Sequence, residues 1–161
     1  MSPGRCTCSD AARARYHRRV SGPILDRFDL RIDVTPPDVD DLMGGSALVS
    51  VPESTAEVAA RVAAARERAA SRGVRCNAEI PGPGLDEVAP LSSDAAGLLE
   101  SQLRDGRLTG RGLHRVRRVA LTIADRDGHD GPLTLEHVAT ALQLRSVRRP
   151  FELGAVSSHG A

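Results

Sequence analysis

The sequence predicts a mainly α-helical protein, most of which is a small four-helix domain. Aromatic residues are almost absent from the 161 residues, with only Tyr16, Phe28 and Phe151 present. The core must therefore consist of Ala, Val, Leu and Ile, which favours thin helical packing over a β-sandwich. From about Ser54 onward, apolar residues recur at helical spacing between capping residues and glycine breaks, which is the pattern of consecutive amphipathic helices.

The N-terminal third is predicted to hold one helix and one strand. Residues 1–10 are small and polar, so we expect no regular structure there. The Ala/Arg-rich stretch 10–20 permits a helix, which a Ser-Gly-Pro sequence ends. Apolar and charged residues alternate over 24–34, which predicts a strand. The acidic, Gly-rich stretch 37–52 is predicted to be a linker or surface loop.

Four helices are predicted in the remainder. The first begins with a capping box, in which Ser54 accepts from the third amide while Glu57 reaches back to the cap, and it ends at Gly73. The stretch 77–92 is rich in Pro and Gly and is predicted to be a loop with at most a short turn. Of the other three helices, the second is predicted to be capped by Ser93, the third to open at Thr109 or Gly110, and the fourth to be capped by Thr134.

All basic residues of this chain are arginines. Lys and Arg together number 22 and every one is Arg, which excludes a Schiff-base lysine and a P-loop lysine. The net charge is only +1, yet residues 104–118 carry six Arg against one Asp. Such segregation suggests an anionic partner, although solvated helix faces give similar counts. No membrane span or signal peptide is visible, so we expect a cytoplasmic protein with no membrane partner.

Two arginine features are candidates for phosphate chemistry. Arg27 lies on a predicted turn before the strand, where a guanidinium can reach a neighbour's phosphate. The alternative for Arg27 is an ion pair with Asp26 or Asp29. On the third helix, the spacing i, i+4, i+7 places three arginines on one face: Arg111, Arg115 and Arg118. This stripe suits nucleotide phosphates or a nucleic-acid backbone, and the alternative is an ordinary solvated face.

Other chemistries find little support. Cys6 and Cys8 form a Cys-Thr-Cys pair, which supplies two of the four ligands that a structural zinc site needs. We therefore predict at most half a zinc site here. None of the five histidines lies four residues from another His or a Cys, so a histidine metal cluster is not expected. No Gly-x-Ser-x-Gly elbow and no Cys-His catalytic context are present, so acyl transfer is unsupported.

Five ordered segments together carry a family resemblance. They are SGPILDRFDLRIDV, the capping box before AARVAAARERAASRG, NAEI, LTGRGLHRVRRVALTIADRDG and LTLEHVATALQLR. Over about residues 5–147 the chain resembles the C-terminal part of the magnesium-chelatase-like AAA+ ATPases, in the ComM or YifB branch. The resemblance implies that 1–52 is a remnant of the α/β ATPase core. It also implies that 54–147 is the four-helix lid, called the Mg chelatase-related C-terminal domain. Helical periodicity is lost after that, so 148–161 is predicted to be a disordered tail.

The resemblance also implies roles for the arginines. Arg27 matches the arginine finger that reaches the nucleotide of the next subunit in a ring. Arg118 aligns best with the sensor-2 arginine of the lid, and Arg111 and Arg115 are its neighbours on the same surface. Full-length members use ATP and Mg²⁺. The ComM branch implies DNA remodelling during competence and recombination, whereas true chelatases insert magnesium into a porphyrin; we favour the DNA role, because GPILDRFDL and the Cys pair resemble the ComM branch more.

The sequence departs from the family pattern in two respects. It has no GxxxxGK[ST] motif and no Walker B segment, so we do not expect it to bind or hydrolyse ATP alone. The Cys-Pro-Cys pair that family members often carry before the pair matched by Cys6 and Cys8 is also absent. We expect a C-terminal fragment that contributes arginines to an ATPase-core partner or a homo-oligomeric ring, whether it arises from a split gene, a truncated product or an inert remnant. The alternative is a non-enzymatic helical module that binds DNA or an ATPase partner.

Overall fold

The structure is a computed structural model that describes residues 7–19, 24, 27–32, 34, 43 and 53–145. The described residues form helices, with no β-strand among them. In chain order the elements are α1 (Asp10–His17), α4 (Thr55–Ser71), the short 3₁₀ helix η1 (Asn77–Glu79), α5 (Leu85–Val88), α6 (Ser93–Arg104), α7 (Gly110–Arg126) and α8 (Leu135–Arg145). The mainly helical fold class is confirmed. None of the helices in this part of the chain has the length and apolar character that crossing a membrane requires.

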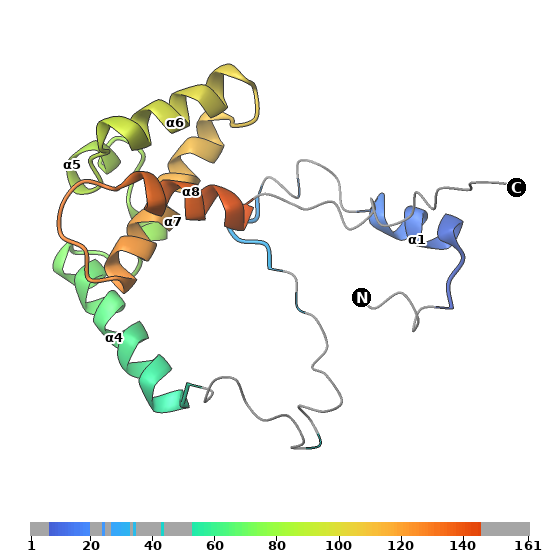
Figure 1. Cartoon of the computed structure of the whole chain (residues 1–161), viewed down its shortest axis with the longest axis horizontal. Coiled ribbons are helices and arrows are strands. Elements are labelled where there is room, and N and C mark those ends of the chain that lie inside the picture. The colour runs from blue at the N-terminus through green and yellow to red at the C-terminus, as the bar shows by residue number, and fades with distance from the viewer. Residues whose placement is uncertain are drawn as a thin grey trace, which may run out of the picture.

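The helix α4 begins where its capping box predicts. Ser54 accepts from the amide of Glu57, and the Glu57 carboxylate accepts from the amide of Ser54 at 2.7 Å. Only the C-terminal half of α4 packs against other elements. Ala69 there is 3% exposed, whereas Val58 and Val62 are 39% and 43% exposed. The N-terminal half of α4 therefore extends away from the other helices (Figure 1).

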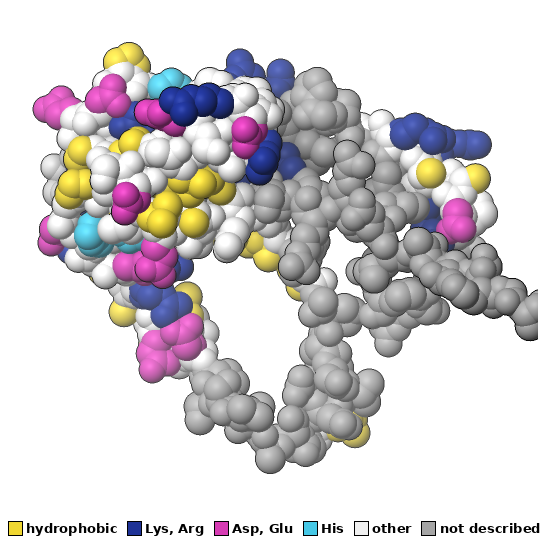
Figure 2. Space-filling view, turned by 45° about the horizontal axis from the view of Figure 1, so that its top comes forward, with side chains coloured by type: hydrophobic (Ala, Val, Ile, Leu, Met, Phe, Trp, Pro, Cys, Tyr) yellow, Lys and Arg dark blue, Asp and Glu magenta, His cyan; other side chains and the backbone are white. Residues whose placement is uncertain are grey.

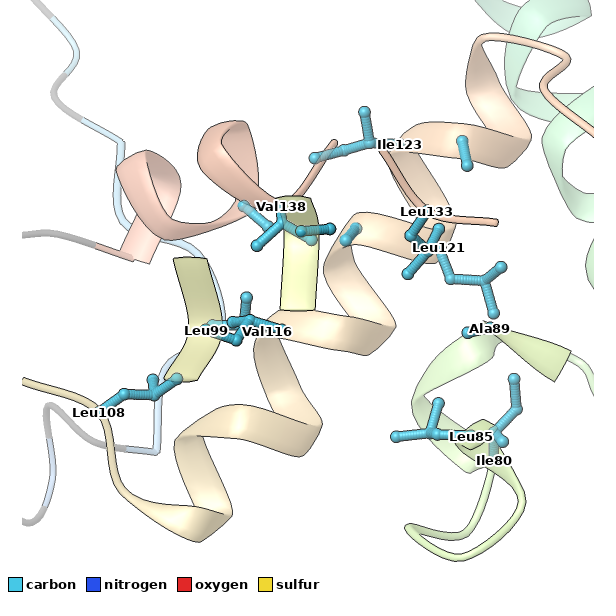
Figure 3. Close-up of a cluster of buried hydrophobic side chains, with 14 residues drawn as sticks. Ile80, Leu85, Ala89, Leu99, Leu108, Val116, Leu121, Ile123, Leu133 and Val138 are labelled. Atoms are coloured by element: carbon cyan, nitrogen blue, oxygen red, sulfur yellow. The ribbon is translucent and has the colours of Figure 1, made fainter. Parts of the chain in front are cut away.

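The central element is α7, which contacts α4, α5, α8 and η1. Thr109 caps it by accepting from the amide of Gly112 at 3.0 Å. One side of α7 supplies Val116, Ala120 and Ala124 to the core, each at most 2% exposed. Leucines from α5 and α6 and a valine from α8 pack against this side, as Figure 3 shows. Aliphatic side chains thus build the core, as the composition predicts.

The Pro- and Gly-rich connection between α4 and α6 has more structure than we expected. It contains η1 and α5, and its apolar residues Ile80, Leu85 and Ala89 are at most 4% exposed. Because these side chains reach the core, the connection is held against α7 although its sequence is rich in turn residues.

Two further expectations need correction. Ser92, not Ser93, caps α6, because its hydroxyl accepts from the amide of Ala95. The strand expected over 24–34 does not form among its described residues. A strand needs a neighbouring strand for its hydrogen bonds. Among the described residues of this segment, the amide of Arg31 instead donates to the carbonyl of Leu144 in α8, at 2.8 Å. The predicted tail, 148–161, lies outside the described residues.

Candidate phosphate-binding site

A small pocket lies beside the middle of α7. It has a volume of about 230 Å³ and is lined by Asp29, Ala78, Arg115, Arg118, Val119 and Thr122. Arg115 and Arg118 are three positions apart on α7, so their side chains emerge on one face one turn apart. Both side chains are half-buried. The pocket therefore presents two arginines in a partly desolvated place, where a charged hydrogen bond is stronger than in bulk water.

Arg118 is held in this pocket by a single contact. Its Nε donates to the carbonyl of Ile80 at 2.9 Å. Nine arginines between residues 53 and 145 lie within ion-pair distance of a carboxylate, but Arg118 does not. Its two terminal nitrogens make no hydrogen bond to any residue that the structure describes, and these nitrogens can donate to an anion.

Arg115 is bound differently. Its guanidinium donates to the Asp29 carboxylate at 2.9 Å and to the carbonyl of Arg27. Arg111, the third member of the predicted stripe, is exposed at the start of α7 and does not line the pocket. The structure thus brings Arg115 and Arg118 together and leaves Arg111 one turn away.

Arg27 lies next to this pocket through its backbone. Its carbonyl is the one that accepts from Arg115, and its own side chain is exposed. Among the described residues that side chain has no hydrogen-bond or ion-pair partner. Asp29, one of the two acidic partners considered for Arg27, pairs with Arg115 instead. The other, Asp26, lies outside the described residues.

The cysteine half site stays a prediction. Cys8 is exposed, and Cys6 lies outside the described residues. Within the described ranges no three His, Cys, Asp or Glu side chains are grouped so that they could hold a metal ion.

Sequence reasoning missed the structural arginine Arg117. It is 6% exposed and donates to the Asp86 carboxylate at 2.6 Å and to the carbonyls of Leu85 and Ala89 at 2.8 and 2.9 Å. Its position could have revealed it. It follows Leu113 by four residues and precedes Ala120 by three, so it falls on the buried stripe of α7.

A buried polar network was also missed. Asp125, 3% exposed, accepts from Arg72 at the end of α4 and from the side-chain amide of Asn77 in η1. The sequence contained a signal for this network, because Asp125 falls on the apolar stripe of its helix. A carboxylate buried at such a position needs hydrogen-bond partners.

Taken together, the described residues form a helical domain in which two arginines of α7 line a small pocket. Comparison with known proteins specifies the class further. Residues 52–145 match the family model described as "Magnesium chelatase, subunit ChlI C-terminal", and residues 1–42 match that of "Magnesium chelatase, subunit ChlI". The chain belongs to the magnesium-chelatase-like family.

Among curated relatives, an uncharacterized protein of Mycobacterium tuberculosis is 41% identical over 147 residues, which cover 89% of this chain and 28% of the relative. The protein YifB of Escherichia coli is 38% identical, with coverage of 88% and 27%. The competence protein ComM of Haemophilus influenzae is 33% identical, with coverage of 84% and 26%. The chain therefore spans less than a third of the length of these relatives. The resemblance to the ComM and YifB branch is confirmed.

Proposed function

We propose that this chain supplies arginines to the nucleotide sites of an ATPase ring. In this proposal Arg118 is the sensor arginine that contacts a nucleotide phosphate. Arg115 and Arg111 extend the same basic surface, and Arg27 is the finger that reaches the nucleotide of the adjoining subunit. The chain contributes no Walker residues, so the ATP and its Mg²⁺ are held chiefly by an ATPase-core partner or by a ring of related subunits.

The observation that carries the proposal is the unpaired guanidinium of Arg118. Most arginines in this domain have a carboxylate partner, as the nine paired arginines between residues 53 and 145 illustrate. Arg118 instead donates through Nε to a backbone carbonyl, its terminal nitrogens make no hydrogen bond to a described residue, and the residue lines a pocket. A planar guanidinium anchored in this way is preorganised to bind phosphate oxygens.

The proposed biological role is DNA remodelling during DNA uptake and recombination. Its support is the similarity to a relative named a competence protein. In this role the nucleotide state, detected by the arginines, moves the helical domain relative to the ATPase core, and that motion acts on DNA.

A second candidate is a non-enzymatic module that binds DNA directly. It is favoured by α1 and its end, where Arg15, Arg18 and Arg19 are exposed, and by the dark-blue side chains gathered there in Figure 2. Duplex DNA binding through such a surface would weaken steeply with salt, since each neutralised phosphate releases counterions. It would not require nucleotide.

The proposal is tested by titrating the 161-residue chain with tripolyphosphate, which presents the same anionic oxygens as a nucleotide. We expect Arg118→Ala to weaken binding about tenfold, the loss of one or two charged hydrogen bonds. The matched control is Arg66→Ala. Arg66, like Arg118, has no carboxylate partner among the described residues, but it is exposed and lies on α4 outside the pocket.

Equal losses in the two variants would show that tripolyphosphate binds by general charge, and the Arg118 assignment would fail.

Arg27 is tested in the assembled ring. There Arg27→Ala is expected to abolish ATP turnover while nucleotide binding persists, because a finger acts on the neighbour's transition state. Retained turnover would contradict the finger assignment.

A further inference from the structure

We propose that Asn77 is a positioning residue for Arg118. It fixes the η1 turn against α7, and that turn supplies the carbonyl that orients the Arg118 guanidinium. The functional meaning of this inference rests on the proposed phosphate role of Arg118, but its geometry can be tested independently.

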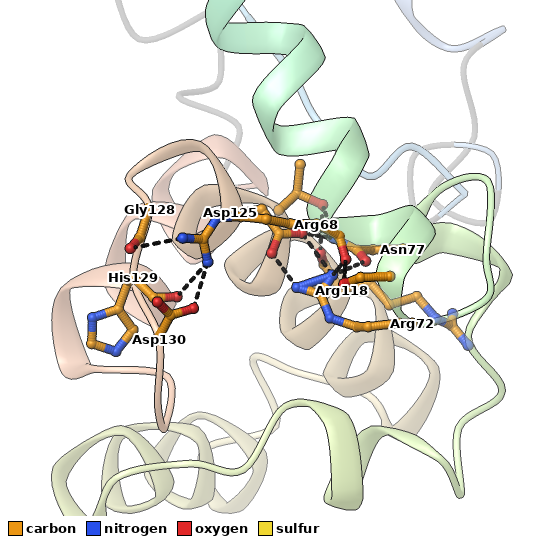
Figure 4. Close-up of polar contacts among 10 residues, drawn as sticks. Arg68, Arg72, Asn77, Arg118, Asp125, Gly128, His129 and Asp130 are labelled. Carbon is orange, nitrogen blue, oxygen red and sulfur yellow. Dashed lines mark hydrogen bonds and ion pairs between the residues drawn. The ribbon is translucent and has the colours of Figure 1, made fainter.

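Asn77 is the centre of a buried polar network between α4 and α7 (Figure 4). Its side chain is 4% exposed and forms three hydrogen bonds. Its Nδ2 donates to Asp125 at 2.7 Å and to the Thr122 hydroxyl at 3.1 Å, and its Oδ1 accepts from Arg72 at 3.2 Å. Almost the full hydrogen-bonding capacity of the amide is used, so Asn77 has one defined orientation.

The carboxylate that receives Asn77 is itself fixed. Asp125 is bound by both terminal nitrogens of Arg72, a two-point contact that sets the plane of the carboxylate. Arg72 is the C-cap residue of α4, and its backbone amide donates to the carbonyl of Ala69. The network therefore joins three elements, and Asn77 is the member that belongs to η1.

Two hydrogen bonds connect the backbone of Asn77 to the side chain of Arg118. The amide of Ile80 donates to the carbonyl of Asn77 at 3.3 Å, which closes the η1 turn. The carbonyl of Ile80 then accepts from Arg118 Nε. A rotation of η1 relative to α7 would move this carbonyl and release the guanidinium, so the Asn77 anchor determines where the phosphate-facing nitrogens lie.

A second connection passes through Thr122. Its hydroxyl accepts from Asn77 and donates to the backbone carbonyl of Arg118 at 2.9 Å. Thr122 also lines the pocket. The side chain of Asn77 is thus linked both to the backbone of Arg118 and, through η1, to its guanidinium.

The test follows the Nε–Hε signal of Arg118 in ¹⁵N-labelled chain by NMR. In the native protein this proton is hydrogen-bonded, so we expect slow solvent exchange. Asn77→Ala is expected to shift the signal and to speed its exchange about tenfold, the effect of losing about one hydrogen bond. An unchanged Arg118 signal in folded Asn77→Ala protein would overturn the proposal.

A matched control at the same turn is Glu79→Gln. Glu79 forms an exposed ion pair with Arg75 at 2.6 Å, and this contact with Arg75 lowers the pKa of Glu79 below its ordinary value. It is not part of the Asn77 network. We expect Glu79→Gln to leave the Arg118 signal unchanged; a change as large as that of Asn77→Ala would mean that any loss at η1 disturbs Arg118.

A second pair of variants covers the case in which Asn77→Ala does not fold. Thr122→Val removes the hydroxyl and keeps the shape, whereas Thr122→Ser keeps the hydroxyl. We expect Thr122→Val to shift the Arg118 signal and Thr122→Ser to restore it. Identical Arg118 signals in the valine and serine variants would contradict the network.

Tripolyphosphate titration of the same variants separates this inference from the proposed function. If the native chain binds tripolyphosphate, Asn77→Ala should weaken binding about tenfold, as Arg118→Ala does. If the native chain does not bind it, the proposed function fails, while the NMR signal still decides whether Asn77 positions Arg118.

Discussion

Two faces of α7 use the same residue type for opposite purposes. On the face toward α5, Arg117 is buried and donates to two backbone carbonyls and a carboxylate. On the face toward the pocket, the next residue, Arg118, makes one anchoring contact and keeps its terminal nitrogens available. Arginine spacing alone therefore does not identify a phosphate site. The partners already bound to each guanidinium decide which arginine is structural and which can bind a ligand.

The largest expected effect is on stability, at Arg117. Arg117→Ala leaves the carbonyls of Leu85 and Ala89 without their donor, at a cost of about 2–3 kcal/mol in the free energy of unfolding. Arg118→Ala should cost less than about 1 kcal/mol, since a single hydrogen bond is lost at a half-buried site. Urea denaturation of both variants measures the difference.

The control for Arg117 is Asp86→Asn. Because the Asp86 side chain is 82% exposed, its ion pair with Arg117 should add little to stability. If Asp86→Asn destabilised the protein as much as Arg117→Ala, the ion pair and not the carbonyl contacts would hold α5. If Arg117→Ala and Arg118→Ala cost the same, the distinction between the two faces would be wrong.

The next effect concerns the start of α7. Thr109→Ala removes the cap that accepts from the amide of Gly112 and should cost about 1 kcal/mol. Amide hydrogen exchange should then rise in the first turn, where Arg111 lies, and not near Arg118. Thr109→Ser is the control, because it keeps the capping oxygen. Faster amide exchange throughout α7 would mean that the first turn, with Arg111, and the turn with Arg118 open together, and not independently as we expect.

The sequence predicts this fold well wherever the signal is local. Capping residues and positive-φ glycines lie within one turn of the helix ends that they determine. Ser54 caps the start of α4 and Gly73, whose φ is 79°, follows its end, as predicted. The strand predicted over 24–34 does not form among the described residues of that segment, for the opposite reason. Alternation shows that a segment suits a strand, but the neighbouring strand that would pair with it is not contained in the same segment.

The candidate site was predictable only in part. Helical spacing correctly places Arg115 and Arg118 on one face. It could not show that Asp29, far away in the sequence, binds Arg115, nor that Ile80 anchors Arg118. Both contacts depend on tertiary packing of distant segments, which spacing within one helix does not encode.

A smaller effect is expected where Asp29 meets Arg115. The Asp29 carboxylate lines the pocket and binds one of its two arginines, so an incoming phosphate must compete with it. Asp29→Asn should raise tripolyphosphate affinity about threefold, in keeping with the modest energy of a half-exposed ion pair. Asp94→Asn, an exposed position on α6, changes the net charge equally and is the control. Equal gains in the two variants would reduce the effect to overall charge.

The smallest expected effect is a pH dependence at His137, on α8. His137 is 7% exposed, and burial lowers its pKa below the ordinary value. Its Nδ1 also accepts from the amide of Thr134 at 3.2 Å, which only the unprotonated nitrogen can do. As pH falls below about 6.5, the unfolded chain takes up a proton that the folded protein resists.

The unfolding free energy should therefore decrease from about pH 6.5 downward and level off below the lowered pKa of the folded state. His137→Asn, whose side-chain oxygen can replace Nδ1 as acceptor but does not titrate, should remove this decrease. Urea denaturation at several values between pH 7.5 and 5 measures it. This range lies above the ordinary carboxylate pKa values, so Asp and Glu contribute little. The same decrease in both proteins would assign it to another histidine, and α8 would then play no part in the acid response.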